Sequence, residues 1–500
     1  MNAAGPEQPT SGTTGPPRPD VVVVGGGIAG LVVAWELARA GRRPVVLESS
    51  SSVGGCVARH TVGGLDLDSG AESYSLATDA VTGLLGDLQL AGAVTAPNPV
   101  GAWVRHAAGA APLPAAALLG IPARPLAADV RHILGPLGAA RAALDRVLPA
   151  RIGAEDGTSL GALVRRRMGR AVVDRLVEPV AGGVYSTDPD ELDVDAVAPR
   201  LRAALRSTGS LAAAVALLRG GAAKPGSAVA GLTGGMFTLV LTLEGEIVRL
   251  GGRLRLNAPV SAVAETSEGW SVRTAAGTFS CTDLVLAVPG PVALALLAGV
   301  LHSAPGASTT SAGTAGADSA GTLDSTALAL SSDVLLATLV VRQPALNSFP
   351  RGTGVLVSRA AGGVTAKALT HATAKWTWLA AAAGPDRHVL RLSYGRGAEP
   401  LPAASDLLPL ALADAAALTG VPLLPRHLQE GAVVPWTSAL PRPQPGHRAA
   451  MNGLRERVAA RPGLRLTGSL VAGTGLAAVV ADARAVATDL LRPSGVRTPD

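Results

Sequence analysis

Apolar residues near the N-terminus change from one periodicity to another along the chain. The run Val21–Val24 has four β-branched residues and no polar alternation, which is typical of a buried parallel strand. Apolar side chains at helical spacing follow from Leu31 to Ala40, and Gly41 can end that helix. A second short apolar run, Val45–Leu47, ends on the acid Glu48. The order of strand, helix and strand predicts the beginning of an α/β, Rossmann-like domain.

The turn between the first strand and the helix matches the pattern G-x-G-x-x-G. Gly25 allows the tight turn, Gly27 lets a phosphate approach the backbone, and Gly30 lets the helix pack on the strand. Unpaired N–H groups at the start of the helix suit a pyrophosphate, and Glu48 suits the hydroxyls of a ribose. We therefore expect a dinucleotide site, although this spacing does not distinguish NAD from FAD.

Later apolar runs predict further strands and helices. The run Leu284–Leu301 reaches the lower limit for a membrane span, but Pro289 and Pro291 divide it, which favours a buried strand, turn and helix. A strand-rich region begins near Val334, and Arg465–Leu491 has the pattern of a strand, a glycine-rich turn and a helix.

The segment Arg124–Gly169 is helical in pattern and rich in Arg, and Ser159 is a suitable N-cap within it. We expect the next helix to end in a loop at Pro179, Gly182 and Gly183.

Two segments lack apolar periodicity. Residues 1–19 are rich in Pro, Gly and Thr and have no apolar h-region, so we expect a disordered leader rather than a signal peptide. Residues 303–326 are of low complexity, and we expect a flexible surface insertion.

Composition and charge narrow the set of partners. Aromatic residues make up only 2% of the chain, which disfavours a base-stacking surface, so no nucleic acid is expected. The net charge of +6, carried mostly by Arg, suits an anionic substrate or an anionic membrane surface, and a GC-rich coding bias explains it equally well. Arg165–Arg167 could make weak peripheral contact with anionic lipid, although a solvated helix face is the preferred interpretation.

The two cysteines, Cys56 and Cys281, lie far apart in the sequence. They exclude a disulfide framework and give no metal-ligand spacing, so we expect no metal and a cytoplasmic location.

Several motifs then point to one family. An acid followed by V-G-G at Val53–Gly55, and G-A-E-S at Gly70–Ser73, resemble the FAD amine-oxidase superfamily. The segments E-P…G-V-Y at Glu178–Tyr185, W…P-Q-P-G-H at Trp436–His447 and G-T-G at Gly473–Gly475 resemble, within it, the oxygen-dependent protoporphyrinogen and coproporphyrinogen III oxidase family, in its Gram-positive bacterial branch.

The resemblance implies an α/β fold with a discontinuous, Rossmann-like FAD-binding domain, a mixed-sheet substrate domain and a helical lobe. The FAD-binding domain would comprise residues 20–95, 225–295 and 425–495, the helical lobe 96–224 and the substrate domain 296–424. The residues that it implies for FAD binding are Gly25, Gly26, Gly27, Ile28, Ala29, Gly30, Leu31, Glu48, Ser49, Gly55, Gly70, Ala71, Glu72, Ser73, Val260, Trp436, Gly468, Thr474, Gly475 and Leu476.

The activity that the resemblance implies is an FAD-dependent oxidation of coproporphyrinogen III to coproporphyrin III in haem biosynthesis, with O2 as acceptor and H2O2 as by-product. Because the flavin supplies the chemistry, no catalytic side chain is expected. A protoporphyrinogen IX oxidase, an FAD amine oxidase, a desaturase and an inactive FAD-binding paralogue remain alternatives. The oligomeric state is left open.

The substrate would lie beside Gly182, Gly183 and Tyr185, with Arg105 as a carboxylate anchor. A solvated surface side chain is the alternative interpretation of Arg105. His371 and Lys375 could face the flavin, although ordinary strand and loop positions are the default interpretation for both. Cys56 stands where the family commonly has Lys or Arg.

Overall fold

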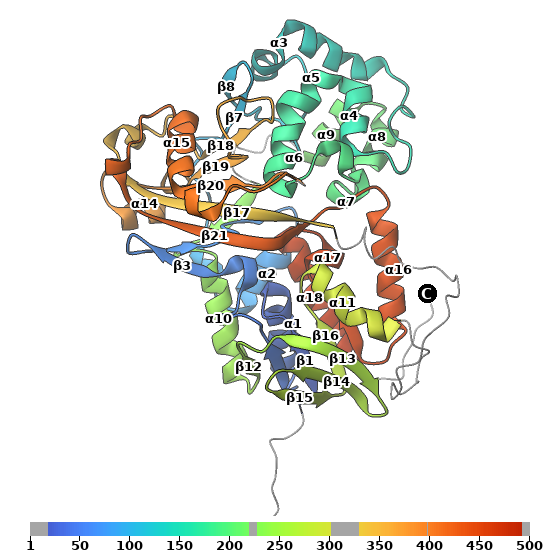
Figure 1. Ribbon diagram of the computed structural model, residues 1–500. Helices are drawn as coiled ribbons and strands as arrows, with labels where there is room; N and C mark the ends of the chain where they lie inside the picture. The colour runs from blue at the N-terminus through green and yellow to red at the C-terminus, as the bar shows by residue number, and fades with distance from the viewer. Residues whose placement is uncertain (1–18, 220–227, 302–329, 398, 493–500) are drawn as a thin grey trace, which may run out of the picture.

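A computed structural model describes residues 19–219, 228–301, 330–397 and 399–492, and Figure 1 shows their arrangement. At the bottom of that view lies a five-stranded sheet whose neighbouring strands all run parallel. Three distant parts of the chain meet in it, as expected for a discontinuous domain. Its strands, in spatial order, are β12 (Arg253–Arg255), β2 (Pro44–Leu47), β1 (Val21–Val24), β16 (Asp283–Leu286) and β22 (Leu464–Leu466).

Helices cover both faces of the parallel sheet. α1 (Ile28–Arg39), α10 (Phe237–Arg249) and α18 (Leu476–Leu491) share one apolar core on one face. α11 (Gly290–Leu301) and α16 (His447–Ala459) share a second core on the other face. The predicted strand, helix and strand at the N-terminus, and the predicted strand, turn and helix at 284–301, are therefore confirmed. A three-stranded antiparallel meander adjoins this layer: β13 (Val260–Thr266), β14 (Gly269–Thr274) and β15 (Gly277–Cys281).

A second, seven-stranded sheet lies above the first layer in Figure 1, and α15 (Leu407–Thr419) packs on one of its faces. The outermost strand β21 lies within the predicted FAD-binding segment 425–495, yet it pairs with β17 along most of its length. Pairing therefore joins it to this sheet, and the domain boundaries stay a prediction. In spatial order the strands are β21 (Leu428–Pro441), β17 (Ser331–Arg342), β20 (Arg387–Tyr394), β19 (Ala368–His371), β18 (Gly354–Val357), β7 (Trp103–His106) and β8 (Gly109–Pro112).

The helical lobe forms the top of the molecule in Figure 1 and has its own apolar core. Ser159 caps α4 as predicted, because its Oγ accepts a hydrogen bond from the N–H of Ala162. The predicted loop at Pro179, Gly182 and Gly183 is wrong. The π-helical segment Val173–Val177 leads directly into α6 and already interrupts the regular hydrogen-bond ladder before Pro179, so the helix accommodates the proline and continues through both glycines. The main helices are α3 (Ala128–Ala143), α4 (Leu160–Met168), α6 (Glu178–Tyr185), α8 (Leu201–Thr208) and α9 (Leu211–Arg219).

The predicted flexible insertion and nearly all of the predicted leader lie outside the described residues. Within the described ranges, no single helix has both the length and the apolar character needed to cross a bilayer. Helices α8 and α9, bent by 118° at a short break, meet that criterion only together.

Candidate cofactor and substrate site

The glycine turn combines tight packing with open space. A Cβ on Gly30 would lie 2.0 Å from the carbonyl oxygen of Gly25, and one on Gly25 would lie 2.5 Å from that of Ala287. Gly25 also has a φ of +103°, which favours glycine. Gly27, the N-cap of α1, has no heavy atom within 4 Å of the same position. Gly30 is thus required for packing, whereas Gly27 leaves room for a ligand at the helix N-terminus.

Glu48 lies at the carboxyl end of β2, beside this open space. Its Oε2 accepts a hydrogen bond of 2.7 Å from the N–H of Gly26. Its Oε1 accepts bonds from the N–H of Ser50 at 2.8 Å and from the hydroxyl of Ser49 at 3.2 Å. These donors hold the carboxylate against the turn, where a ribose next to the pyrophosphate would meet it.

The V-G-G segment continues the same surface. A Cβ on Gly55 would lie 3.3 Å from the Cα of Gly27, so the two backbones almost touch. The carbonyl of the next residue, Cys56, accepts the N–H of Ala71 at 2.7 Å, and Gly70 packs against that carbonyl. The Cys56 side chain is accessible to solvent, although desolvation by the surrounding chain raises the pKa of its thiol.

The second glycine-rich turn approaches the first. A Cβ on Gly468 would lie 3.8 Å from the Cβ of Ala29 in α1, and α18 packs along α1. Gly475 is the N-cap of α18, and neither Gly473 nor Gly475 has a heavy atom within 4 Å of its Cβ position. Gly27 and Gly475 thus each leave free space at a helix N-terminus, and such N-termini suit an anion-bearing ligand.

Two predicted cofactor residues from distant segments also border this region. Val260 begins β13, two residues after Ala258, whose N–H donates to the carbonyl of Glu48 at 2.8 Å. The indole Nε1 of Trp436 donates to the carbonyl of Ser69 at 3.0 Å, which places the ring beside the G-A-E-S segment.

Glu72 is the centre of a cluster of charges. Its Oε1 lies 2.6 Å from the Lys375 Nζ, and its Oε2 lies 2.9 Å from Nη1 of Arg391. Arg391 also donates to the carbonyl of Gly70 at 2.6 Å. Burial would raise the pKa of Glu72, but the two cations outweigh it and hold that pKa below its ordinary value. Burial, together with the charge of Arg391, lowers the pKa of nearby His60 to about 4.

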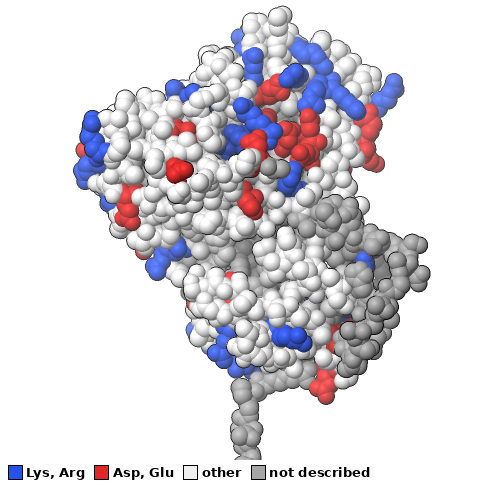
Figure 2. Space-filling view, viewed as in Figure 1, with Lys and Arg blue, Asp and Glu red and all other residues white. Residues whose placement is uncertain are grey.

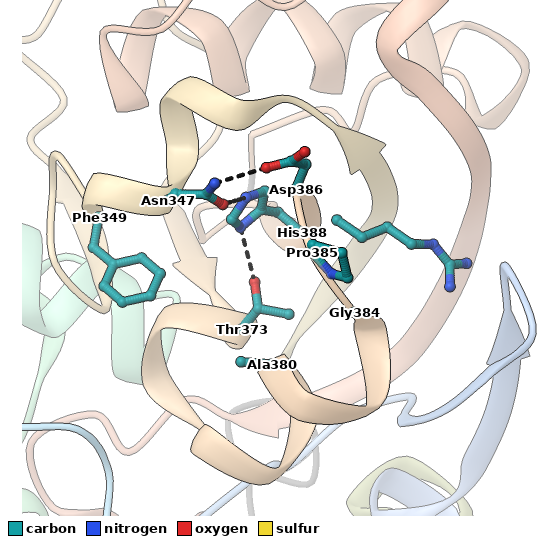
Figure 3. A pocket seen from close by; sticks show the side chains of 9 residues that line it. Asn347, Phe349, Thr373, Ala380, Gly384, Pro385, Asp386 and His388 are labelled. Carbon is teal, nitrogen blue, oxygen red and sulfur yellow. Dashed lines mark hydrogen bonds between the residues drawn. The ribbon is translucent and has the colours of Figure 1, made fainter.

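The structure separates His371 from Lys375. The cross-strand partner of His371 is Leu390, which belongs to the core beneath α15. The Nε2 of His371 lies 3.1 Å from Nδ1 of His388, whose Nε2 lies 3.0 Å from Oδ1 of Asn347. Figure 3 shows His388 and Asn347 in the wall of a pocket of about 290 Å³. Burial lowers the pKa of His371 to about 3, so both rings are neutral, and His371 contributes nothing to the cluster around Glu72.

The face of the seven-stranded sheet opposite α15 is partly open. A cross-strand row of Leu336, Ser393, Ala368 and Leu356 is partly accessible, whereas the alternate residues, such as Ala337, are buried under α15. Because side chains alternate between faces, this row points away from that helix. We call it the open row.

Arg391 links the open row to the predicted cofactor residues. It stands two positions before Ser393 on β20, so both side chains lie on the same face. Thr338 and Thr370 flank it across the strands. The open row therefore faces the same region as Glu72.

Helix α6 closes the other end of the open row. A Cβ on Gly183 would lie 2.7 Å from Cδ2 of Leu356, and one on Gly182 would lie 3.3 Å from Nη1 of Arg396. The two glycines let the helix backbone approach the sheet closely. Tyr185 packs on the core of the helical lobe, and burial raises the pKa of its hydroxyl.

Arg105 is not brought to this region. Its guanidinium donates to the carbonyls of Ala417, at the end of α15, and Gly362, at 3.1 and 3.4 Å. Those contacts connect β7 to α15 and to the loop that contains Gly362.

The arginines of α4 are also engaged. Arg165 forms two hydrogen bonds with Asp190, and Arg166 lies 3.3 Å from Glu155. Arg167 is buried and pairs with Asp145. The sequence alone did not show that these three cations have partners. Among the described residues, no three His, Cys, Asp or Glu side chains gather in a way that could hold a metal ion.

The sequence of this chain matches a known protein family whose members bind a flavin, in agreement with the open space at the two glycine turns. The family model described as flavin containing amine oxidoreductase matches residues 28–309, more than half of the chain. The chain therefore belongs to that family and is an oxidoreductase. The open space at Gly27 and Gly475, with Glu48 beside it, fits FAD as the cofactor.

Within this family, the chain is similar over nearly its full length to several individual proteins. The chain is 29% identical over 481 residues to the coproporphyrinogen III oxidase of Mycobacterium tuberculosis, covering 94% of this chain and 96% of the relative. It is 25% identical over 488 residues to that of Bacillus subtilis, with 94% and 97% covered. A crystal structure from Exiguobacterium, assigned as a protoporphyrinogen oxidase, superposes with a TM-score of 0.78 at 26% identity, covering 94% of this chain and 98% of that one.

Proposed function

We propose that this protein is an FAD-dependent oxidase that converts coproporphyrinogen III into coproporphyrin III in haem biosynthesis. The overall reaction consumes three O2 and releases three H2O2 for each porphyrin formed. The observation that carries the proposal is full-length similarity to coproporphyrinogen III oxidases, combined with an open row that faces the predicted cofactor residues.

The residues of the chain would divide the work of binding. The N–H groups at the start of α1 and α18 would hold the pyrophosphate, and Glu48 would accept hydrogen bonds from the ribose hydroxyls. Bound FAD would supply the redox chemistry, namely hydride removal from a methylene bridge of the porphyrinogen with loss of a pyrrole N–H proton, and O2 would serve as the final acceptor. The open row and Gly183 would form an apolar floor for the macrocycle. Glu72, held by Lys375 and Arg391, would fix the edge of the site nearest the flavin.

Protoporphyrinogen IX oxidation is the second candidate. A chloroplastic protoporphyrinogen oxidase of Arabidopsis thaliana is 33% identical, but only over 186 residues, or 35% of this chain. The full-length relatives from Mycobacterium and Bacillus favour coproporphyrinogen III, whereas the full-length Exiguobacterium structure, assigned as a protoporphyrinogen oxidase, keeps protoporphyrinogen IX as the second candidate.

Amine oxidation has less support. The putrescine oxidase structures superpose at 17% identity, which supports the fold alone. Among the described residues, the ring pairs found join Phe349, His371 and His388, away from the open row.

A direct assay tests the proposal. The protein, reconstituted with FAD, is mixed with freshly reduced coproporphyrinogen III or protoporphyrinogen IX, and porphyrin fluorescence and H2O2 are followed together. We expect turnover of coproporphyrinogen III with three H2O2 per porphyrin. A Gly27→Ala variant, which should fold but bind FAD poorly, is the matched control. A flavin-loaded protein that oxidises neither porphyrinogen faster than this control would refute the proposal.

Contact with an anionic membrane surface stays a prediction. The paired arginines of α4 do not supply it, because their charges are matched by neighbouring acids.

A further inference from the structure

A second cavity is formed by residues outside the candidate cofactor and substrate site. The pocket of about 290 Å³ in Figure 3 is bordered by α14 (Thr377–Ala383), by the 3-10 segment Pro344–Ser348 and by the start of β20. None of the residues that line it is among those predicted to bind the cofactor or the substrate. In its wall, His388 stands three positions before Arg391 on β20, so the two side chains leave the strand on opposite faces. His388 therefore points away from the open row.

The polar wall of this pocket is a chain of hydrogen bonds that all point the same way. A carboxylate only accepts, so the Asn347 amide presents its Nδ2 to Asp386, 2.7 Å from Oδ1. The Oδ1 of Asn347 then accepts from Nε2 of His388 at 3.0 Å, and Nδ1 of His388 accepts from Nε2 of His371 at 3.1 Å. Each N–H donates toward Asp386, and aligned hydrogen bonds of this kind strengthen one another and stabilise its negative charge. Burial lowers the pKa of His388 to about 4 and that of His371 to about 3, so neither ring offsets that charge.

The carboxylate of Asp386 lacks a cationic partner. Within the described ranges, no Lys or Arg forms an ion pair with it, and its one side-chain hydrogen bond comes from Asn347. The neighbouring Arg387 turns away, because its Nε donates to Oε1 of Gln429 at 2.6 Å and its guanidinium contacts the carbonyl of Gly63. Figure 2 shows charges of both signs scattered around α14, without a broad acidic patch on that face. The attraction is therefore local, which suits a small cation better than a basic macromolecule.

The rest of the pocket wall is apolar and partly strained. Phe349, Ala380 and Pro385 supply its apolar surface. Phe349 has a φ of +48° and Asp386 a φ of +60°, in the left-handed region that residues other than glycine rarely adopt. Such residues persist where the surrounding structure holds them, and they are common at ligand sites. Here they place an aromatic ring and a carboxylate on the walls of one cavity, a combination that attracts organic cations.

We propose that this pocket is a second binding site, which takes a small organic cation with an N–H-bearing head on an apolar body. The head donates to the other carboxylate oxygen of Asp386, and the body packs against Phe349 and Ala380. A volume of about 290 Å³ lies at the lower end of the range for ligand pockets, so the ligand is small. A bare metal ion fits less well, because the described residues offer no group of three His, Cys, Asp or Glu side chains that could hold one.

Benzamidine is a suitable probe, because it joins a planar cationic head to an apolar ring, and benzamide is its neutral analogue. Isothermal titration calorimetry of the full chain loaded with FAD should show saturable binding of benzamidine, with a dissociation constant of about 1 mM or tighter. Benzamide should bind at least about ten-fold more weakly, because it lacks the charge that Asp386 attracts. The absorption spectrum of the flavin should stay unchanged, because the pocket is separate from the cofactor site.

Two variants test the pocket itself. Asp386→Asn removes the charge, and the variant should fold because asparagine tolerates left-handed backbone; benzamidine affinity should fall by about ten-fold or more. Ala380→Phe fills the cavity but keeps the carboxylate, and it should abolish binding. The matched control is Asp156→Asn, which removes an acid that is 88% exposed on the helical lobe and should leave the affinity unchanged. Flavin content and circular dichroism confirm that each variant is folded.

Three results would overturn the proposal. The first is absence of saturable benzamidine binding, and the second is equal affinity for benzamidine and benzamide. The third is an affinity for benzamidine that neither Asp386→Asn nor Ala380→Phe changes, which would place the probe elsewhere; a shift of the flavin spectrum would then point to the cofactor site. None of these results depends on turnover of a porphyrinogen, so the proposed function is judged separately.

Discussion

The two ends of the candidate site are built in different ways. At Gly25–Gly30 the surface consists of backbone groups from one short segment, and a single carboxylate, Glu48, completes it. Around Glu72 the surface consists of side chains, and the partners Lys375 and Arg391 lie 303 and 319 residues away in the sequence. The backbone end needs glycines, which have no side chain, whereas the charged end needs one carboxylate paired with two cations. Substitutions should therefore affect the two ends differently.

The largest expected effect separates packing from binding within the glycine turn. Gly30→Ala puts a methyl group 2.0 Å from a carbonyl oxygen and should lower the free energy of unfolding by roughly 3 kcal/mol or more. Gly27→Ala enters open space and should leave stability within about 0.5 kcal/mol, while FAD affinity falls by about a hundred-fold. Denaturant titration and flavin titration of the apoprotein measure the two quantities. Equal loss of stability in both variants would contradict the assignment of Gly27 to the ligand.

Glu72→Ala tests the charged end. It leaves two largely buried cations without their carboxylate, so the free energy of unfolding should fall by about 3–5 kcal/mol. Glu246→Ala is the matched control, because the pair that Glu246 forms with Arg249 on α10 is exposed to solvent. Loss of that pair should change the free energy of unfolding by less than about 0.5 kcal/mol. Urea denaturation of both variants gives the comparison. Similar, small losses in both would show that the cluster is not buried in solution.

Lys367 offers a contrast with the paired Lys375. It is buried, and its Nζ contacts the hydroxyl of Ser186 rather than a carboxylate. Burial, with the charge of Arg396, lowers its pKa from 10.5 to about 7. The unfolded chain therefore binds more protons between those values, so this side chain makes stability rise with pH from about 7 to 10.5.

The slope contributed by Lys367 should approach, at most, about 1.4 kcal/mol per pH unit, and Lys367→Met should remove it. Chemical denaturation at several values between pH 7 and pH 10 measures the difference between the two proteins. Parallel pH profiles would show that the amine titrates normally.

The smallest effect is expected at the single carboxylate of the backbone end. Glu48→Gln keeps an oxygen for the N–H of Gly26 but removes the negative charge, so FAD affinity should fall by about ten-fold with little change in stability. Asp66→Asn, on an exposed hairpin, is the control and should leave affinity unchanged. An unaltered affinity for Glu48→Gln would remove Glu48 from the cofactor site.

Prediction from sequence worked best where interactions are local. The strand β1, the helix α1, the strand β2 and the acid after it follow from periodicity and turn chemistry within 28 consecutive residues, 21–48. The prediction of a loop at Pro179–Gly183 was wrong, because the π-helical segment Val173–Val177 already interrupts the regular hydrogen-bond ladder before the proline. Close packing on Leu356 compensates for the weak helix propensity of the glycines.

The charged end could not be read from local pattern. Arg391 occupies an ordinary strand position, and Lys375 follows a strand by a few residues, so neither carries a motif. Alternation along β20 puts Arg391 on the same face as Ser393, but only the tertiary fold brings both cations to Glu72. Arg105 shows the converse, because a plausible anchor in the sequence proves to be engaged with backbone carbonyls behind the sheet.

By itself, the sequence determined the glycine turn, its acid and the order of strands and helices around them, because each depends on residues within one or two turns of chain. Tertiary structure decided which charges are neutralised, which sheet face stays open and which partners the arginines engage. Those properties depend on burial and on partners hundreds of residues apart, and no local pattern records either.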